Sequence, residues 1–326
     1  MSGPSSAEAA IRVAVRRALP DPPAVVLVAC SGGPDSLALA AATAFEARGR
    51  GIRAGAVVVD HGIQPGSDAV ARLAADQCRA LGLGPVMIKS FVIEAGPNLE
   101  ARARDARYEA LGEAAGELGA AAVLLGHTLD DQAESVLLAL ARGSGSRALS
   151  AIPPRRGVYR RPLLAIRRAE TIEACEEAGL VVWDDPMNRP GGPHRSLRAE
   201  VRATVIPVLV EVLGDGAVLG LARSAELARA DSEALDRLAE DAEVRAVIGG
   251  EVLVAQLEHE LSAVRRRVLR RAAVAWGAGP GSLTVRHIDA LDSLISDWHG
   301  QGPVSLPDGI DAVRTCGKLV ARPRVR

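Results

Sequence analysis

The sequence predicts an α/β fold, in which a doubly wound, mostly parallel sheet carries a nucleotide site and a smaller, mainly helical second domain follows. Short apolar runs alternate with helical patterns along the first part of the chain, as in parallel sheets that helices cover on both faces. A turn rich in Ser and Gly directly follows the first of these runs. The alternation stops near Pro207, and 326 residues suit two domains better than one. We therefore expect domains at 1–207 and 208–326.

The first domain is expected to begin with a helix. Ser5 and Glu8 have the spacing of a capping box. Apolar residues then recur every four positions, at Ile11, Val15 and Leu19. Apolar runs bounded by turn residues predict strands, which lie at 24–29, 54–60, 85–91, 121–126 and 180–183. Patterns of helical period predict one helix after the Ser/Gly turn and others at 67–81, 98–118, 130–142 and 167–178.

The second domain has a different texture. A long, charged helical stretch at 217–247 is expected to connect it to the first domain. A short strand at 251–254 and two helices are expected to follow. The end of the chain, 303–322, has the pattern of short strands.

Composition narrows the class of protein. The net charge of −1 does not by itself indicate a nucleic-acid partner. No apolar stretch approaches the ~20 residues of a membrane span. The cysteines form neither a Cys-x-x-Cys pair nor a zinc pattern, and their scatter suits a reducing, cytoplasmic setting. They are Cys30, Cys78, Cys175 and Cys316. The oligomeric state stays open, with a homodimer as one option.

The turn after the first strand has the layout of an anion-binding loop. Glycines let a backbone approach a phosphate closely, and the helix that follows adds unpaired N–H groups and a partial positive charge. No Gly-Lys-Ser/Thr occurs, so this is not a Walker A loop. The alternative is a strand–helix turn without a ligand. The loop residues are Ser31, Gly32, Gly33, Pro34, Asp35 and Ser36.

A second motif runs from Gly126 to Ser135, at the end of a predicted strand and the start of a helix. Asp130 and Asp131 open that helix, and paired carboxylates near a polyphosphate suit Mg²⁺. His127 is a candidate to contact phosphate or to move a proton. The alternative is that the two carboxylates only cap the helix. Because strand ends meet at one edge of a parallel sheet, we expect this motif, Asp60-His61-Gly62 and the loop to converge.

A third motif lies on the helix expected at 98–118. Glu100, Arg104, Arg107 and Tyr108 share one face at spacings of three and four. The arginine pair is suited to phosphates or a nucleotide. Taken alone, the pattern favours the alternative, a solvated face with salt bridges.

Two basic stretches indicate a nucleic-acid partner. Eight arginines and no acidic residue lie between Arg142 and Arg168, and such a charge suits a nucleic-acid backbone. A second cluster, 265–271, lies on a predicted helix of the second domain. Two separate patches suit a large structured RNA. For the second cluster, an ordinary charged helix is an equally weighted alternative.

With these motifs in order, the chain resembles the tRNA(Ile)-lysidine synthetases, which belong to the N-type ATP pyrophosphatases with a PP-loop. The resemblance covers roughly residues 25–205, and the second domain matches only in length and texture, as a short form without an extra C-terminal domain. The matching residues are Ser31–Ser36, Asp60-His61-Gly62, Asn98-Leu99-Glu100, Arg104, Arg107-Tyr108, His127, Asp130-Asp131-Gln132, Glu134, Arg142-Gly143-Ser144-Gly145, Arg161-Pro162-Leu163-Leu164, Asp185-Pro186 and Asn188.

The resemblance implies a ligase that uses ATP and Mg²⁺ to modify tRNA. Its partners would be free L-lysine and an isoleucine tRNA with a CAU anticodon. The oxygen on carbon 2 of the wobble cytidine would attack the α-phosphorus of ATP, and lysine would then displace AMP from carbon 2. Three residues, His127, Asp131 and Glu134, remain candidates to accept the lysine proton.

The resemblance also implies a role for each matching position. The catalytic residues would be Asp35, Arg104, Arg107, His127, Asp131 and Glu134. The metal would lie near Asp35, Asp130 and Asp131. ATP would bind at Ser31, Gly32, Gly33, Pro34, Asp35, Ser36, Asp60, His61 and Gly126.

Three other readings of the sequence compete with this one. A tRNA thiolase of the same superfamily would need catalytic or cluster-binding cysteines, often as Cys-x-x-Cys. A non-catalytic ATP-binding module would bind ATP without releasing AMP and would not need the basic 142–168 segment. An RNA-binding protein with a decayed ATP site would show no effect of ATP, and the intact loop argues against it.

Overall fold

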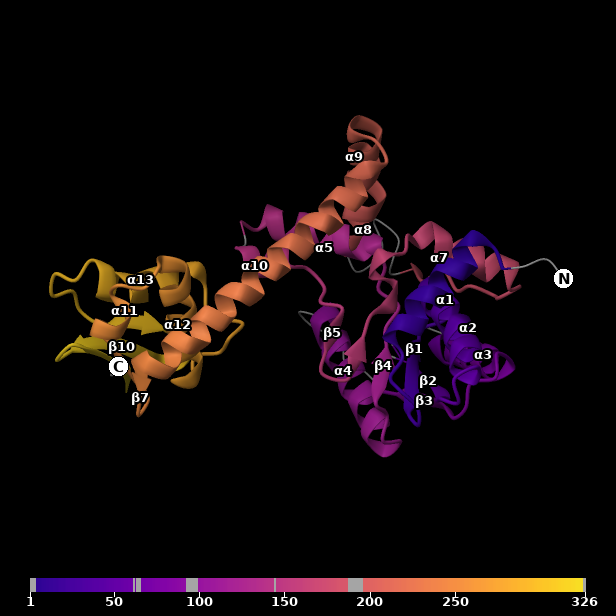
Figure 1. The fold of residues 1–326 in the computed structure, drawn as a ribbon, viewed down its shortest axis with the longest axis horizontal. Helices are drawn as coiled ribbons and strands as arrows, with labels where there is room; N and C mark the ends of the chain where they lie inside the picture. Colours follow the sequence, from indigo (N-terminus) through magenta and orange to yellow (C-terminus); the bar gives the residue numbers. More distant parts are fainter. Residues whose placement is uncertain are drawn as a thin grey trace. The chain divides into compact units, whose positions relative to one another are not determined.

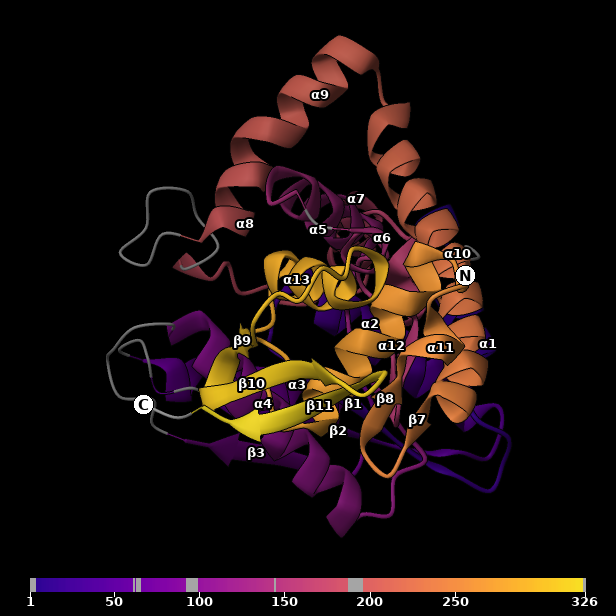
Figure 2. The same ribbon diagram turned by 90° about the vertical axis from the view of Figure 1, so that its left-hand side faces the viewer.

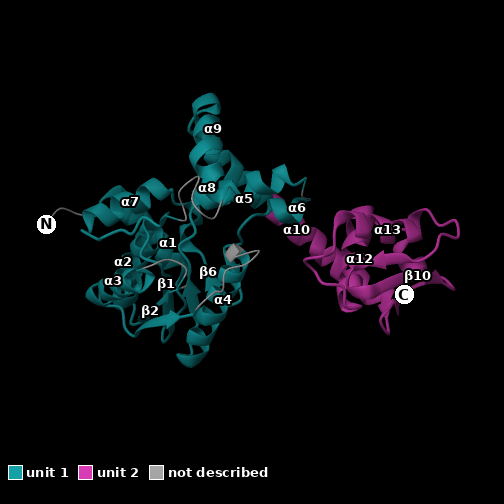
Figure 3. Ribbon diagram, turned by 180° about the vertical axis from the view of Figure 1, so that it is seen from behind, with its two compact units in different colours: residues 1–227 teal, residues 228–326 magenta. Residues whose placement is uncertain are grey.

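The computed structural model describes residues 4–60, 62, 66–91, 99–143, 145–186 and 196–324. The chain divides into two compact units, residues 1–227 and 228–326 (Figure 3). The division falls within α10 (Gly216–Ala246), a helix that begins in the first unit and ends in the second.

The first unit is built on a six-stranded sheet in the order β3-β2-β1-β4-β6-β5. All neighbouring strands are parallel except β5 and β6, which form an antiparallel pair. The chain places β2 and β3 on one side of β1 and β4 on the other, so the switch point lies between β1 and β4. This sheet confirms the predicted α/β class. The strands are β1 (Val25–Cys30), β2 (Arg53–Asp60), β3 (Val86–Ser90), β4 (Ala122–Leu124), β5 (Arg155–Arg156) and β6 (Tyr159–Arg160).

Successive residues of β1 face two separate cores because a strand alternates its side chains. Val26, Val28 and Cys30 pack in one core, and Leu27 and Ala29 pack in the other. All five are buried, and truncating a buried Leu to alanine costs about 2–5 kcal/mol. The second core lies under α4 (Leu99–Glu117), on the opposite face of the sheet (Figure 1). The first lies under α1 (Ser6–Ala18), α2 (Pro34–Arg48), α3 (Ser67–Ala80) and α7 (Arg168–Glu177).

A third, smaller core joins the later helices of this unit. Ile206 and Val218 pack against Leu129 and Ala133. Because Val218 belongs to this core, the first unit extends past the predicted boundary near Pro207. The elements of this region are α5 (Leu129–Ala141), α6 (Ser146–Leu149), η1 (Pro162–Ala165), α8 (Leu197–Glu200), η3 (Val201–Val205) and α9 (Ile206–Leu213).

The corner between α9 and α10 exposes apolar side chains, among them Val208, Val212 and Leu213. Within the described residues, no single helix is both long and apolar enough to cross a membrane. One pair of helices, Leu197–Leu213 and Gly216–Ala246, meets the requirements of length and composition jointly but bends by 106° at its break.

The strand predicted at 180–183 is wrong. The side-chain amide of Gln77 bonds both the N–H and the carbonyl of Val181, and the Trp183 N–H donates to Gly32 O at 2.9 Å. These bonds hold the segment against α3 and the Ser/Gly loop, so it does not join the sheet. The sheet instead gains the hairpin β5–β6, whose two-residue strands offer no apolar run to detect.

The second unit combines helices with a five-stranded antiparallel sheet in the order β7-β8-β11-β10-β9 (Figure 2). The sheet contains both strand regions that were expected, 251–254 and 303–322. Leu269, Leu291 and Leu319 are fully buried between its helices and its sheet. The elements are β7 (Val247–Ile248), β8 (Glu251–Leu253), α11 (Val254–Leu257), α12 (Ser262–Ala275), α13 (Val285–Ser296), β9 (Val304–Leu306), η4 (Pro307–Gly309), β10 (Ile310–Thr315) and β11 (Lys318–Pro323).

The basic cluster of α12 ties this unit together. Arg265 pairs with Asp292 of α13 at 2.6 Å, and Arg267 pairs with Asp236 of α10 at 3.1 Å. Arg271 pairs with two glutamates of α10. Because acidic neighbours neutralise these arginines, the contacts favour the alternative interpretation, an ordinary charged helix.

Candidate active site

The Ser/Gly loop joins β1 to α2 and is held by its own hydrogen bonds. Ser36 Oγ accepts from the Ser31 N–H at 3.1 Å and donates to Gly33 O at 2.9 Å. Gly32 has a φ of 81°, a left-handed conformation that favours glycine. Pro34 is the first residue of α2, so the loop surrounds the N-terminus of that helix. Such a terminus is a ready site for an anion.

The close packing of position 126 against this loop leaves room only for a glycine. A β-carbon at Gly126 would lie 3.0 Å from the carbonyl oxygen of Asp35 and 3.2 Å from the backbone nitrogen of Ser36. The end of β4 therefore approaches the start of α2 closely, across the switch point of the sheet. This contact brings the second motif beside the loop, as the convergence of strand ends predicts.

Asp35 and Asp131 share one arginine that neither motif contains. Arg168 Nε lies 3.2 Å from Asp35 Oδ2, and Arg168 Nη2 lies 3.0 Å from Asp131 Oδ1. The outer oxygens are bonded as well: Thr171 donates to Asp35 Oδ1 at 2.5 Å, and the Thr128 N–H donates to Asp131 Oδ2 at 2.7 Å. Two carboxylates from different helices thus face a single guanidinium.

Asp130 has a different environment from Asp131. Its Oδ2 accepts from the Arg168 N–H at 2.8 Å, and its Oδ1 lies 3.2 Å from Arg167 Nη2. Asp130 therefore caps the N-terminus of α7 with Oδ2 and pairs with the Arg167 guanidinium through Oδ1. This contact fixes α7, and with it the side chain of Arg168, relative to α5.

Glu134 is the most deeply buried carboxylate of the site, with no exposed side-chain surface. Arg202 binds both of its oxygens, at 2.7 and 3.1 Å, and also lies 3.4 Å from Asp131 Oδ1. A bidentate pair of this kind compensates the charge of a buried glutamate. Arg202 comes from η3, so four separate segments of the chain build the site.

The environment shifts the pKa values of these carboxylates in different directions. Burial raises the pKa of Asp35, and it raises that of Glu134 against the opposing effect of Arg202. Burial also acts to raise the pKa of Asp131, but Arg168, the Thr128 N–H, His127 and Arg202 together lower it. Asp131 is therefore held ionised, which suits a ligand of a cation.

His127 lies between β4 and α5 as a neutral imidazole. Burial lowers its pKa to about 3, helped by the positive charges of nearby arginines and opposed by Asp131. Its Nδ1 atom is buried and has no hydrogen-bond partner within the described part of the chain. His127 thus offers a hydrogen-bonding group rather than a positive charge to an incoming substrate.

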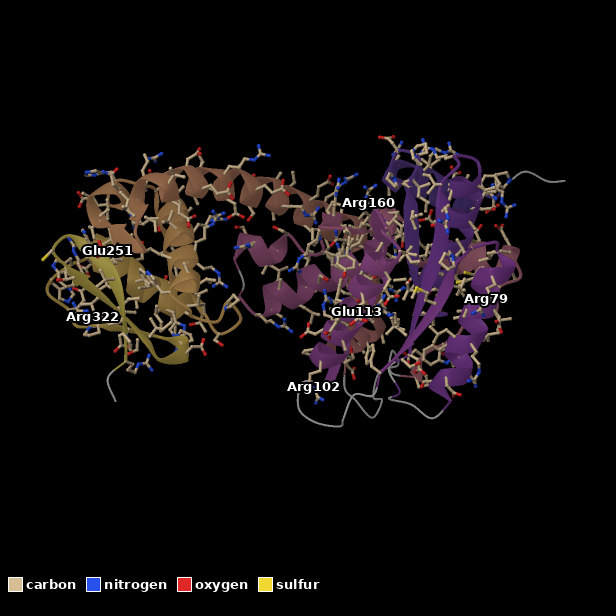
Figure 4. The ribbon with its side chains drawn as sticks, turned by 90° about the horizontal axis from the view of Figure 1, so that it is seen from below. Arg79, Arg102, Glu113, Arg160, Glu251 and Arg322 are labelled. Atoms are coloured by element: carbon tan, nitrogen blue, oxygen red, sulfur yellow. The ribbon has the colours of Figure 1, made fainter. Side chains whose placement is uncertain are left out.

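The arginines of α4 have separate environments. Arg107 lines a small cavity together with Cys30, Ser31 and hydrophobic residues of β1 and β2, and burial lowers its pKa. Arg104 is exposed, and its guanidinium carbon lies 5.4 Å from the centre of the Tyr108 ring. Arg102, labelled in Figure 4, is also exposed. Arg107 is therefore the arginine of α4 that is placed beside the loop.

The arginines of the basic 142–168 segment also differ in environment, since some are buried or paired and others are exposed. Arg161 is buried and donates to the Tyr108 hydroxyl at 3.1 Å, while Arg160 bonds the carbonyl of Ala18. Arg167 and Arg168 pair with the site carboxylates. Four arginines of the segment remain exposed: Arg142, Arg147, Arg155 and Arg156.

Comparisons with known proteins identify the family. A family profile described as a PP-loop domain matches residues 8–209, and one described as the TilS substrate binding domain matches residues 253–320. The tRNA(Ile)-lysidine synthase of Streptomyces coelicolor is 48% identical over 98% of this chain and 99% of its own length. Those of Salinispora arenicola and Thermobifida fusca are 51% and 49% identical over at least 95% of each chain. The chain belongs to the tRNA(Ile)-lysidine synthase family.

Membership of the lysidine synthase family confirms the resemblance carried by the motifs. The U34-tRNA thiolase NcsA from Methanococcus maripaludis shares the fold of the chain, with a TM-score of 0.55 over 68% of this chain and 78% of its own. The two sequences are 21% identical, so this likeness is one of fold.

For a lysidine synthase, the predicted site residues are only partly brought together. The structure groups the loop with Gly126, His127, Asp131 and Glu134, and places Arg107 beside the loop. Asp60 lies at the end of β2, where its Oδ1 accepts from the Gly62 N–H at 3.0 Å. His61, Asn98, Asn188 and the side chain of Glu100 lie outside the described residues.

Sequence reasoning missed the residues that bond the carboxylates of the site. Arg168, Thr171 and Arg202 come from segments far from the motifs they bond. One signal was available, since Glu134 and Asp131 lie on a largely apolar helix and need positive partners once buried. The other signal was Arg168, the last arginine of the 142–168 segment, which contains no acidic residue and was interpreted as a contact for nucleic acid.

Proposed function

We propose that this chain ligates L-lysine to carbon 2 of the wobble cytidine in isoleucine tRNA with a CAU anticodon, converting ATP to AMP and pyrophosphate. The main support is that relatives named tRNA(Ile)-lysidine synthase match this chain along nearly their whole length, at 48–51% sequence identity. The match includes the substrate binding domain, residues 253–320. A thiolase, the nearest rival, shares only the fold.

The reaction divides into two displacements. The carbon 2 oxygen of cytidine forms a bond to the α-phosphorus of ATP, and the bond to pyrophosphate breaks. The N–H groups of the 31–36 loop and Arg107 are placed to stabilise negative charge on the phosphates. The lysine amine then bonds to carbon 2, AMP leaves with the oxygen, and the amine loses a proton. Of the three candidate acceptors, Asp131 is the weakest carboxylate base, because its pKa is lowered.

The carboxylates of the site fit a Mg²⁺ ion. Oxygen atoms of Asp35 and Asp131 face the same guanidinium, whose positive charge lies where a metal cation would bind. Mg²⁺ prefers such oxygen ligands, completed by phosphate and water, and when bound it offsets charge on the phosphates. We assign its binding to Asp35 and Asp131. A role for Asp130 stays a prediction, since one of its oxygens caps α7 and the other pairs with Arg167.

We further propose that the exposed arginines of the 142–156 segment contact the tRNA backbone. The enzyme would work in the cytoplasm, where tRNA and free lysine are available and where its cysteines stay reduced. This proposal holds for a monomer and for a homodimer alike.

Incorporation of labelled lysine into purified isoleucine tRNA with a CAU anticodon tests the function, with methionine tRNA as the control RNA and AMP release followed in parallel. We expect label in the isoleucine tRNA alone, and AMP formation that requires both tRNA and lysine. Asp131→Asn should lose at least about 100-fold in turnover. Asp76→Asn, an exposed carboxylate paired with Arg79, is the matched control. AMP release without lysine transfer would contradict the proposed nucleophile.

A further inference from the structure

The place expected for a metal is already taken by a side chain. Arg168 reaches Asp35 and Asp131 with two different nitrogen atoms, at 3.2 and 3.0 Å. Only about a fifth of its side chain is exposed, and the Asp131 side chain is 11% exposed. A buried carboxylate needs a compensating charge. Arg168 supplies that charge.

Arg168 and a metal ion compete for the same oxygens. A Mg²⁺ ion binds carboxylate oxygens at roughly 2.1 Å. A guanidinium within 3.2 Å of both Asp35 Oδ2 and Asp131 Oδ1 occupies the space between them and repels a second cation. The two cations therefore exclude each other unless Arg168 moves to another anionic partner.

A bound nucleotide provides that partner. Arg168 is the first residue of α7, where its backbone N–H donates to Asp130 while its side chain extends to the other two carboxylates. The loop beside Asp35 is the expected place of the phosphates, and a guanidinium binds phosphate as well as it binds carboxylate. We infer that Arg168 is a built-in counter-cation that closes the Asp35–Asp131 pair to free divalent ions, so that the metal enters only together with the nucleotide.

Binding of Mn²⁺ to the full chain without nucleotide tests this inference. Free Mn²⁺ is measured by electron paramagnetic resonance in titrations of the wild type, Arg168→Gln and Arg267→Gln. We expect Arg168→Gln to gain one Mn²⁺ site at least about tenfold tighter than any site of the wild type. Arg267→Gln is the matched control, since its guanidinium is similarly buried and pairs with Asp236 on α10, a carboxylate outside the proposed site. Its Mn²⁺ binding should equal that of the wild type.

Two further measurements locate the gained site and control for folding. Adding Asp35→Asn to Arg168→Gln should abolish the gained site. Because Arg168→Gln leaves buried carboxylates unpaired, its melting temperature should fall without metal and recover with Mn²⁺. Arg168→Lys keeps a cation and should gain no site. Equal Mn²⁺ affinity in wild type and Arg168→Gln, or a gained site that survives Asp35→Asn, would overturn the inference.

The inference rests on the carboxylate pair of the proposed active site, and its outcome is separable from that of the proposed reaction. If Arg168→Gln gains the Mn²⁺ site but no lysine is transferred by the wild type, only the proposed reaction fails. If lysine is transferred and the metal site does not appear, only the role of Arg168 fails.

Discussion

At the scale of single residues, the buried imidazole of His127 links stability to pH. Its pKa is about 3 in the folded chain and about 6.5 when unfolded. Between these values the unfolded chain binds the extra proton, so this residue lowers the unfolding free energy as pH falls below about 6.5, by at most about 1.4 kcal/mol per pH unit. We expect His127→Gln to flatten the pH dependence of stability in that range.

Urea titrations at several pH values measure this effect. His259→Gln is the control, because that side chain is 90% exposed. The two variants are compared with the wild type, so contributions cancel from carboxylates other than Asp131, whose pKa His127 also affects. A slope in His127→Gln equal to that of the wild type would show that the imidazole is not buried in its neutral form.

The close approach at Gly126 gives a second prediction at this scale. In Gly126→Ala the new methyl group meets the backbone of Asp35, so the loop must shift. Such overpacking costs about 1–3 kcal/mol of stability, and we expect at least about tenfold weaker ATP binding in calorimetry. Gly116→Ala is the matched control, because α4 leaves open space there and alanine favours a helix by roughly 0.5–1 kcal/mol. Unchanged ATP affinity in Gly126→Ala would contradict the packing argument.

At the scale of elements, the arginines of strand β5 and those of helix α12 have different environments despite their similar charge. Arg155 and Arg156 are exposed, whereas Arg271 pairs with two glutamates. Replacing both arginines of β5 with glutamine should weaken tRNA binding and reduce the salt dependence of the affinity by about two ion contacts. Arg271→Gln should leave that salt dependence unchanged and lower the stability of the second unit. Filter-binding at several salt concentrations distinguishes the two.

The elements also show what is predictable. Long patterns such as the Val-rich run at 24–29 predict their strands, because a strand buried on both faces must be apolar throughout. The two-residue strands of the hairpin carry no such pattern, and the apolar run at 180–183 has its backbone bonded by Gln77 and Gly32 instead. The residues of the site also differ in how far the sequence predicts them. Its anionic groups lie in local motifs, while Arg168 and Arg202 reach it only through the tertiary fold.

At the scale of the whole molecule, the boundary within α10 predicts how the chain can be cut. Residues 1–227 keep Val218 in the core beside Leu129 and Ala133, whereas a cut at 207 removes it. We expect the 1–227 fragment to bind ATP within a few-fold of the full chain. The free energy of unfolding of the 1–207 fragment should be lower by at least about 2 kcal/mol, since this fragment loses the buried Val218 and the helix that carries it.

The same fragments test the role of the second unit. If residues 228–326 recognise the tRNA, the 1–227 fragment loses the discrimination between isoleucine and methionine tRNA while it still binds ATP. Lysine transfer assays on both tRNAs measure this. Full selectivity in the fragment would place recognition in the first unit.

The scattered origin of the active site has a consequence for synthesis on the ribosome. The loop and its helix emerge early, but Asp131 follows about a hundred residues later, and Arg168 and Arg202 later still. Contacts of such long sequence separation form late in folding. A nascent chain therefore has no complete set of charges around its phosphate loop until about residue 202 has left the exit tunnel.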